Sequence, residues 1–269
     1  MLKKKTVENE QVIYFEYAPP YPDDSADSPG NLKAPFRGAP GYKGSVYYYW
    51  YEFLKLNPRY KSHCQFKDQY ELEPIYQDFK NIHKMDFITW WMHHGRALFA
   101  EPAEGSIILD PSEVLRNQGY LFLGVPADLN VDRALFELKA ILTSRLENNS
   151  AQPFKSQARY PIYSRPNISA LHKALAAAMV LSEQGNENLS LAILAQLTAK
   201  KMRELENSKN APIDISITAI HTIKNNVLNM IENTAFGLFP KDDVLGSEKE
   251  ADKAKIIAWE ERRKSQFRV

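Results

Sequence analysis

Residues 44–58 read Gly-Ser-Val-Tyr-Tyr-Tyr-Trp-Tyr-Glu-Phe-Leu-Lys-Leu-Asn-Pro, and the interpretation of the fold depends on this stretch. Its aromatic and β-branched residues have a high propensity for strands. Its two ends carry helix signals instead, because Ser45 can cap a helix at the N-terminus and Pro58 disfavours helical backbone in the residue before it. We therefore predict a helix over residues 45–57, with a strand as the alternative.

The predicted helix lies within a basic and aromatic segment, residues 33–67, which carries seven bases against one acid and ten aromatic residues. Basic side chains attract phosphates, and exposed aromatic faces stack on nucleobases. Helical aromatic residues also build cores, and the six acids between residues 8 and 27 can neutralise the bases. Core packing and nucleic-acid contact both stay open. For nucleic-acid contact, the candidate residues in this segment are Lys43, Tyr47, Tyr51, Arg59 and Lys61.

The composition along the chain predicts a predominantly helical α+β protein with two domains. The runs with strand-like composition are residues 11–17, 106–109 and 120–125. Six prolines and three glycines make residues 18–41 an irregular arm. The small, polar segment 148–153 ends in proline and is the best domain boundary. We therefore expect a small aromatic-rich α+β domain over residues 1–150 and a helical bundle over residues 151–269.

The second domain combines helices with basic residues. Apolar periodicity and capping residues predict four helices, at residues 169–184, 189–206, 215–236 and 247–269. A basic stretch ahead of consecutive helices is typical of helix-turn-helix domains, so a helix-turn-helix-like arrangement is possible and DNA is favoured over RNA. The candidate phosphate contacts here are Arg159, Arg165 and Lys224.

No motif in the sequence identifies a reaction, and the catalytic residues stay unknown. Glycine-rich phosphate loops are absent, and the histidines lack the spacing of zinc ligands, so we expect no cofactor and no metal. A metal-dependent nuclease or other hydrolase is the alternative from another class. Its candidate residues are Asp110, Glu113 and Asp128.

The composition of the chain indicates the cellular compartment in which the protein works. The only cysteine, Cys64, cannot form an internal disulfide, and no apolar run approaches the roughly 20 residues that span a bilayer. The lysines at residues 3–5 are not followed by the apolar region of a secretory signal. We therefore expect a cytoplasmic protein that does not contact membranes.

A third hypothesis is a protein-binding subunit of a larger complex. The last predicted helix ends in a basic run that complements the helix dipole, and two aromatic residues accompany that run. Trp259 and Phe267 are the candidate contacts to a protein partner.

Several motifs resemble those of a group of uncharacterised bacterial proteins from accessory and mobile genetic regions. The motifs are Gly-Tyr-Lys-Gly-Ser-Val-Tyr-Tyr-Tyr-Trp at 41–50, Trp-Trp at 90–91 with Gly-Arg-Ala-Leu-Phe-Ala-Glu-Pro at 95–102, Arg-Tyr-Pro at 159–161 and Gly-Leu-Phe-Pro at 237–240. The resemblance spans most of the chain and implies a shared fold and gene context, without any catalytic residue.

This gene context favours transcription regulators, mobile-element accessory factors and antiviral defence components over metabolic enzymes. We therefore expect a non-enzymatic nucleic-acid-binding or assembly protein of such a system.

Overall fold

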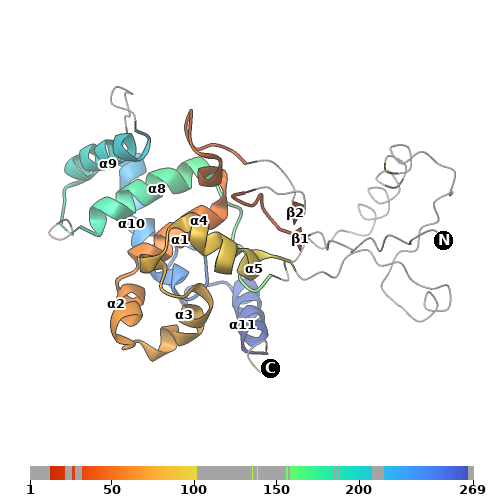
Figure 1. Cartoon of the computed structure of the whole chain (residues 1–269). Coiled ribbons are helices and arrows are strands. Elements are labelled where there is room, and N and C mark those ends of the chain that lie inside the picture. Colours follow the sequence, from red (N-terminus) through yellow and green to blue (C-terminus); the bar gives the residue numbers. More distant parts are fainter. Residues whose placement is uncertain are drawn as a thin grey trace, which may run out of the picture. The chain divides into compact units, whose positions relative to one another are not determined.

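The structure is a computed structural model of the chain. It describes residues 13–21, 26–27, 32–101, 158–183, 188–207 and 215–265, together with a few isolated positions. Residues 1–103 and 157–269 form one compact unit, and residues 104–156 form another. Nearly all described residues belong to the first unit, whose helices are drawn in colour in Figure 1. The predicted boundary at 148–153 and the predicted strands at 106–109 and 120–125 lie outside the described residues.

The predicted aromatic helix is confirmed as α1 (Val46–Leu56). Ser45 caps it by accepting a hydrogen bond from the Tyr47 N–H, and a 3-10 turn, η1 (Gly41–Gly44), precedes it. Most residues of α1 are buried, whichever face of the helix they lie on, and Trp50 is 0% exposed. A helix that is apolar around its circumference belongs inside a core, and α1 packs against α8 (Ile168–Leu181) and α10 (Ile217–Thr234).

A second helix, α2 (Pro58–Phe66), begins where α1 ends. Asn57 closes α1 and caps α2, because its Oδ1 accepts a 2.9 Å hydrogen bond from the Tyr60 N–H. Its Nδ2 donates a 3.0 Å bond to the carbonyl oxygen of Ile231 on α10, and the residue is fully buried. Pro58 occupies the first turn of α2, where its missing N–H costs nothing. Asn57 thus joins three helices.

Replacing Asn57 by alanine is expected to lower the free energy of unfolding by about 2–3 kcal/mol. The change removes a helix cap and leaves a buried carbonyl oxygen without its donor, which together give this magnitude. Urea unfolding followed by circular dichroism measures it. Asn167→Ala is the matched control, since the exposed Asn167 caps α8 by accepting from the Ala170 N–H alone, and should cost about 1 kcal/mol. Equal losses in the two variants would contradict the cross-link to α10.

Short helical elements carry the rest of the aromatic core. They are η2 (Tyr70–Leu72), α3 (Glu73–Phe79), η3 (Ile82–Lys84), α4 (Phe87–Trp90), the π-helical turn η4 (Trp91–Gly95) and α5 (Arg96–Phe99). Trp90 is fully buried, and its Nε1 donates a 3.0 Å hydrogen bond to the carbonyl oxygen of Phe79. A Cβ on Gly95 would lie 2.6 Å from the Trp90 ring, so glycine allows the π-helical turn to pack there.

The C-terminal helices follow the predicted pattern. They are α8, α9 (Leu191–Leu205), α10 and α11 (Glu250–Ser265), and α8, α9 and α10 pack on one another. Ala174 and the three alanines at 176–178 of α8 are buried, which lets neighbouring elements approach closely. Figure 1 shows α1 beside α8, so the described parts of the chain before residue 101 and after residue 158 share one core.

The predicted α+β class of the N-terminal region is wrong, because the described residues there are helical. Strand pairing among the described residues is confined to the two-residue parallel pair of β1 (Ile13–Tyr14) with β2 (Ala26–Asp27) and one bridge from Phe15 to Ala100. The physical reason is that aromatic residues suit any buried surface. Phe15 is 1% exposed and lies 5.8 Å from the ring of Trp91, so it supplies a core ring instead of a sheet.

None of the helices in the described part of the chain is both long enough and apolar enough to cross a membrane.

Candidate functional site

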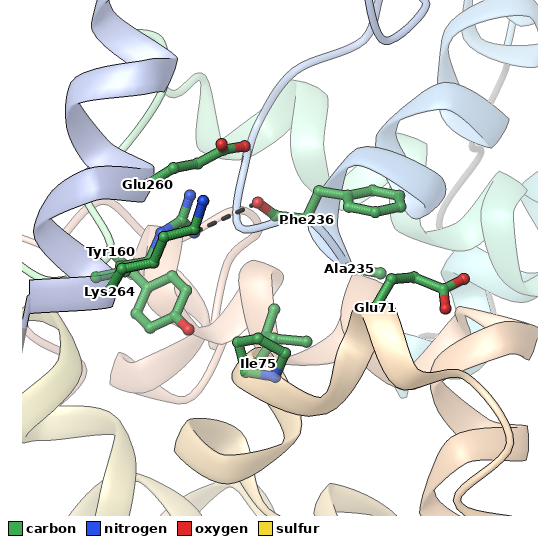
Figure 2. Close-up of a pocket in the computed structure, with 9 residues that line it drawn as sticks. Glu71, Ile75, Tyr160, Ala235, Phe236, Glu260 and Lys264 are labelled. Carbon is green, nitrogen blue, oxygen red and sulfur yellow. Dashed lines mark hydrogen bonds between the residues drawn. The ribbon is translucent and has the colours of Figure 1, made fainter. Parts of the chain in front are cut away.

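A cavity of about 260 Å³ lies between α3, the end of α10 and α11, and Figure 2 shows the side chains around it. We call it the α3–α11 pocket. Its apolar lining comes from Pro74, Ile75, Tyr160, Ala235 and Phe236. Its charged lining comes from Glu71, Glu260, Arg263 and Lys264. An apolar pocket with a few charged groups is the usual form of a binding site.

Gly237 allows the chain to close one wall of this pocket. It follows the end of α10 with a φ of 73°, which residues with a Cβ rarely adopt. A Cβ there would lie 1.9 Å from Nη1 of Arg263. Without that atom, the Arg263 guanidinium lies 5.2 Å from the centroid of the Tyr160 ring. It also donates a 3.3 Å hydrogen bond to the carbonyl oxygen of Phe236, the dashed line in Figure 2.

The polar groups of the pocket suit recognition better than proton transfer. The Tyr160 hydroxyl donates a 2.6 Å hydrogen bond to Oδ2 of Asp78. Burial is the main cause that raises the pKa of Tyr160 far above its ordinary value, so the phenol keeps its proton. Glu71 forms an ion pair with Arg59. The lining therefore offers apolar surface and fixed charges to a ligand.

Two large aromatic side chains are exposed on the segment that leads into the pocket-lining residue Glu71. Phe66, at the end of α2, is 73% exposed, and Tyr70, at the start of η2, is 83% exposed. Glu71 follows Tyr70 in the chain and lines the pocket. Aromatic residues are enriched at protein interfaces relative to the rest of the surface. We call Phe66, Tyr70 and the α3–α11 pocket the aromatic–pocket surface.

The turn that carries these two rings is fixed by hydrogen bonds. Nδ1 of the fully buried His63 accepts a 3.2 Å bond from the Gln69 N–H, and its Nε2 lies 2.8 Å from Oε2 of Glu73. The Ser62 hydroxyl donates a 2.6 Å bond to Asp68. The rings are therefore presented on an ordered turn, which reduces the entropy lost when a partner binds.

Two of the three arginines predicted to contact phosphates, Arg59 and Arg159, are paired within the protein. Arg59 bridges Glu71 and Glu232, the latter at 2.6 Å. Arg159 pairs with Asp78 at 2.8 Å, where its side chain is 19% exposed. Both guanidinium groups hold distant segments together, so phosphate contact by either would require these ion pairs to break.

Two of the predicted lysines also have internal partners. Nζ of Lys43 donates a 3.0 Å hydrogen bond to the Leu205 carbonyl oxygen and lies over the Phe36 ring, and burial lowers its pKa. Nζ of Lys224 donates a 3.2 Å bond to the Leu189 carbonyl oxygen. These lysines serve as links between elements.

The remaining residues of the predicted nucleic-acid set fall into two groups. Lys61 on α2 and Arg165, ahead of α8, are exposed, and Arg165 lines a second cavity of about 280 Å³ between α8 and α10. Tyr47 and Tyr51 are 1% and 0% exposed, so their rings present no face to a nucleobase. Core packing is therefore the correct interpretation of these two aromatics.

The residues predicted to bind a protein partner lie elsewhere. Trp259 is 3% exposed and packs against Lys255, whose Nζ lies 4.5 Å from the centroid of its ring. It is therefore a packing residue of α11. Phe267 lies outside the described residues.

The geometry lends no support to the residues considered as metal ligands or as a nucleophile. No group of histidine, cysteine and acidic side chains suited to a metal occurs among the residues that could be searched, those that the structure describes. Cys64 is buried, and desolvation raises its pKa to about 11, so it stays a thiol near neutral pH. Asp110, Glu113 and Asp128 lie outside the described residues.

A buried titratable group lies between η1, α8 and the end of α9. Nε2 of His172 lies 3.4 Å from Oε1 of Glu206, and the ring is 2% exposed. Burial, with a smaller contribution from the nearby Lys43 charge, lowers the pKa of His172 to about 4. The imidazole is therefore neutral near pH 7, and it packs 5.2 Å from the Phe36 ring.

Sequence reasoning does not find the lining of the α3–α11 pocket. Its residues come from four separate segments of the chain, so no local pattern in the sequence joins them. Comparison with known proteins supplies no further guide: no protein-family model, no curated protein and no solved structure matches the chain. Function must therefore be inferred from the site itself.

Proposed function

We propose that this protein is a protein-binding subunit of a larger complex, and that it docks a partner through the aromatic–pocket surface. The observation that carries the proposal is the exposure of two rings, Phe66 and Tyr70, on the segment that leads into Glu71, which lines the largely apolar pocket. Interfaces are anchored by aromatic side chains and pockets of this kind. Burial of one such ring by a partner contributes roughly 2 kcal/mol.

The charges favour a protein over a nucleic acid at this surface. The pocket has two acids, Glu71 and Glu260, beside Arg263 and Lys264. A phosphate backbone requires a surface with a clear excess of bases, whereas protein interfaces have mixed polar rims. Four of the six bases predicted to contact phosphates already have internal partners. We therefore prefer protein docking to nucleic-acid binding as the function of this surface. Contact with nucleic acid stays a prediction at Lys61 and Arg165.

Site-specific photo-crosslinking tests the proposal. The photoreactive residue benzoylphenylalanine replaces Tyr70, and in a second variant it replaces Leu228, which is 54% exposed on α10. In cells that make the protein naturally, irradiation should give a discrete protein adduct at position 70 and none at position 228. The partner is then identified and purified. Tyr70→Ala should weaken its binding by about thirtyfold, the effect of an interface residue worth about 2 kcal/mol.

Two outcomes count against the proposal. Equal adducts at positions 70 and 228 would show that the surface has no preferred partner. Crosslinks to nucleic acid would favour the alternative, which a titration with labelled duplex, single-stranded DNA and RNA at two salt concentrations then examines. Lys61→Glu is the clean probe in that titration, because Lys61 is exposed, whereas reversal at Arg59 also breaks two ion pairs.

A further inference from the structure

We infer that the segment docking in the α3–α11 pocket is an acidic peptide that inserts one large apolar side chain. This inference rests on the proposed function and adds the chemistry of the partner. It follows from the size of the pocket and from the charges of its lining that have no ion pair among the described residues.

The volume of the pocket limits the size of the apolar group that a ligand can insert into it. About 260 Å³ is below the roughly 300–1,000 Å³ typical of sites that enclose a whole small molecule. A single phenylalanine or leucine side chain fits this space better. The apolar residues of the lining that would meet it include Ile75, Ala235, Tyr160 and Phe236.

The charged residues of the lining indicate which charge the ligand should carry. Glu71 is already paired with Arg59. In the part of the chain that the structure describes, Arg263 is held by the Phe236 carbonyl oxygen and forms no ion pair with an acid. Lys264 is exposed and likewise has no ion pair there. Glu260 is the acid that α11 contributes to the lining, beside Arg263 and Lys264, so the α11 part of the lining has two bases against one acid.

These two features together favour an acidic peptide over the alternatives. A nucleic-acid strand would bring phosphates to Arg263 and Lys264, but its evenly spaced negative charges would also meet Glu71 and Glu260 of the same lining. A basic peptide would meet Glu260 and Glu71 but would face the Arg263 guanidinium, which its contacts fix in place. An acidic peptide can pair its carboxylates with Arg263 and Lys264 and can insert a large apolar side chain into the pocket.

The test uses three short fluorescein-labelled peptides and fluorescence anisotropy. One peptide carries a central phenylalanine between glutamates, the second has alanine in place of the phenylalanine, and the third has lysines in place of the glutamates. Each is titrated against the full-length protein and against Lys264→Glu, Glu260→Lys and Lys200→Glu. The last is the matched control, because Lys200 is exposed on α9 and does not line the pocket. Unfolding curves confirm that the surface variants remain folded.

The acidic phenylalanine peptide should bind best. Lys264→Glu should weaken it by roughly five- to tenfold, Glu260→Lys should strengthen it, and Lys200→Glu should leave it unchanged. The lysine peptide should show the opposite response to the two pocket variants. Equal affinity for all three peptides, or no binding by any, overturns the inference. The proposed function is judged separately by crosslinking at Tyr70, so the two can fail independently. Displacement of the peptide by a labelled oligonucleotide would also contradict the inference.

Discussion

Replacement of Trp50 by alanine is expected to destabilise the protein by about 3–5 kcal/mol, the usual cost of removing a large core aromatic side chain. Trp50 is 0% exposed and lies at the centre of the aromatic core. Its ring centroid lies 5.0 Å from that of Phe99, 5.9 Å from Tyr160 and 5.6 Å from Phe239. The contacts come from segments on both sides of residues 104–156, so the cavity left by the substitution would weaken the whole unit.

Urea and thermal unfolding measure this loss. The total stability of a domain is about 5–15 kcal/mol, so Trp50→Ala should be largely unfolded well below the wild-type midpoint. Phe66→Ala is the matched control within the same basic and aromatic segment, because Phe66 is 73% exposed and should change the midpoint little. Similar midpoints for the two variants would show that the aromatic segment does not divide into core and surface as described.

Replacement of Asp78 by alanine is expected to cost about as much, about 3–5 kcal/mol, through a different mechanism. The Asp78 carboxylate accepts a 2.9 Å hydrogen bond from Nε of Arg159 and a 2.6 Å bond from the Tyr160 hydroxyl. Nη2 of Arg159 lies 2.8 Å from its other oxygen. Without the carboxylate, the largely buried Arg159 guanidinium and the Tyr160 hydroxyl each lose an acceptor, and these bonds between the 158–160 segment and α3 are lost.

The loss at Asp78 is again measured by urea unfolding. Asp86→Ala is the control, because the exposed Asp86 caps α4 by accepting from Thr89 and should cost about 1 kcal/mol. Arg159→Ala should also destabilise the protein, since it removes the same ion pair. A stable Arg159→Ala variant with weakened binding to DNA would instead support Arg159 as a nucleic-acid contact.

The helices of this fold can be predicted wherever capping residues mark their ends. Ser45 begins α1, and Asn167, Ser190 and Ser216 cap the helices that follow residue 158. The α2 helix is absent from the prediction although Asn57 and Pro58 signal its start, because Pro58 is equally a signal that the preceding helix stops. Among the described residues of the strand predicted at 11–17, β1 covers two residues and Phe15 adds one bridge, and the Phe15 ring packs into a core formed by α1 and η4. Propensity is local, whereas that packing depends on tertiary contacts.

The candidate site can be predicted only in part, because its residues meet through contacts across long sequence separations. Composition alone indicates that the segment 33–67 is unusual, but it does not show that α1 is core while Phe66 is exposed. It does not identify the acids that neutralise its bases either. Arg59 pairs with Glu232, which is 173 residues away, instead of with the acidic block before residue 28. Pairing at this distance has no local signature.

The affinity of Tyr70→Ala for a purified partner, compared with that of Leu228→Ala, tests the proposed docking function most directly. Both side chains are exposed, and neither supports the core, so both variants should fold normally. Isothermal titration calorimetry should give about thirtyfold weaker binding for Tyr70→Ala and near wild-type binding for Leu228→Ala. Wild-type affinity in both variants would contradict docking through the aromatic–pocket surface.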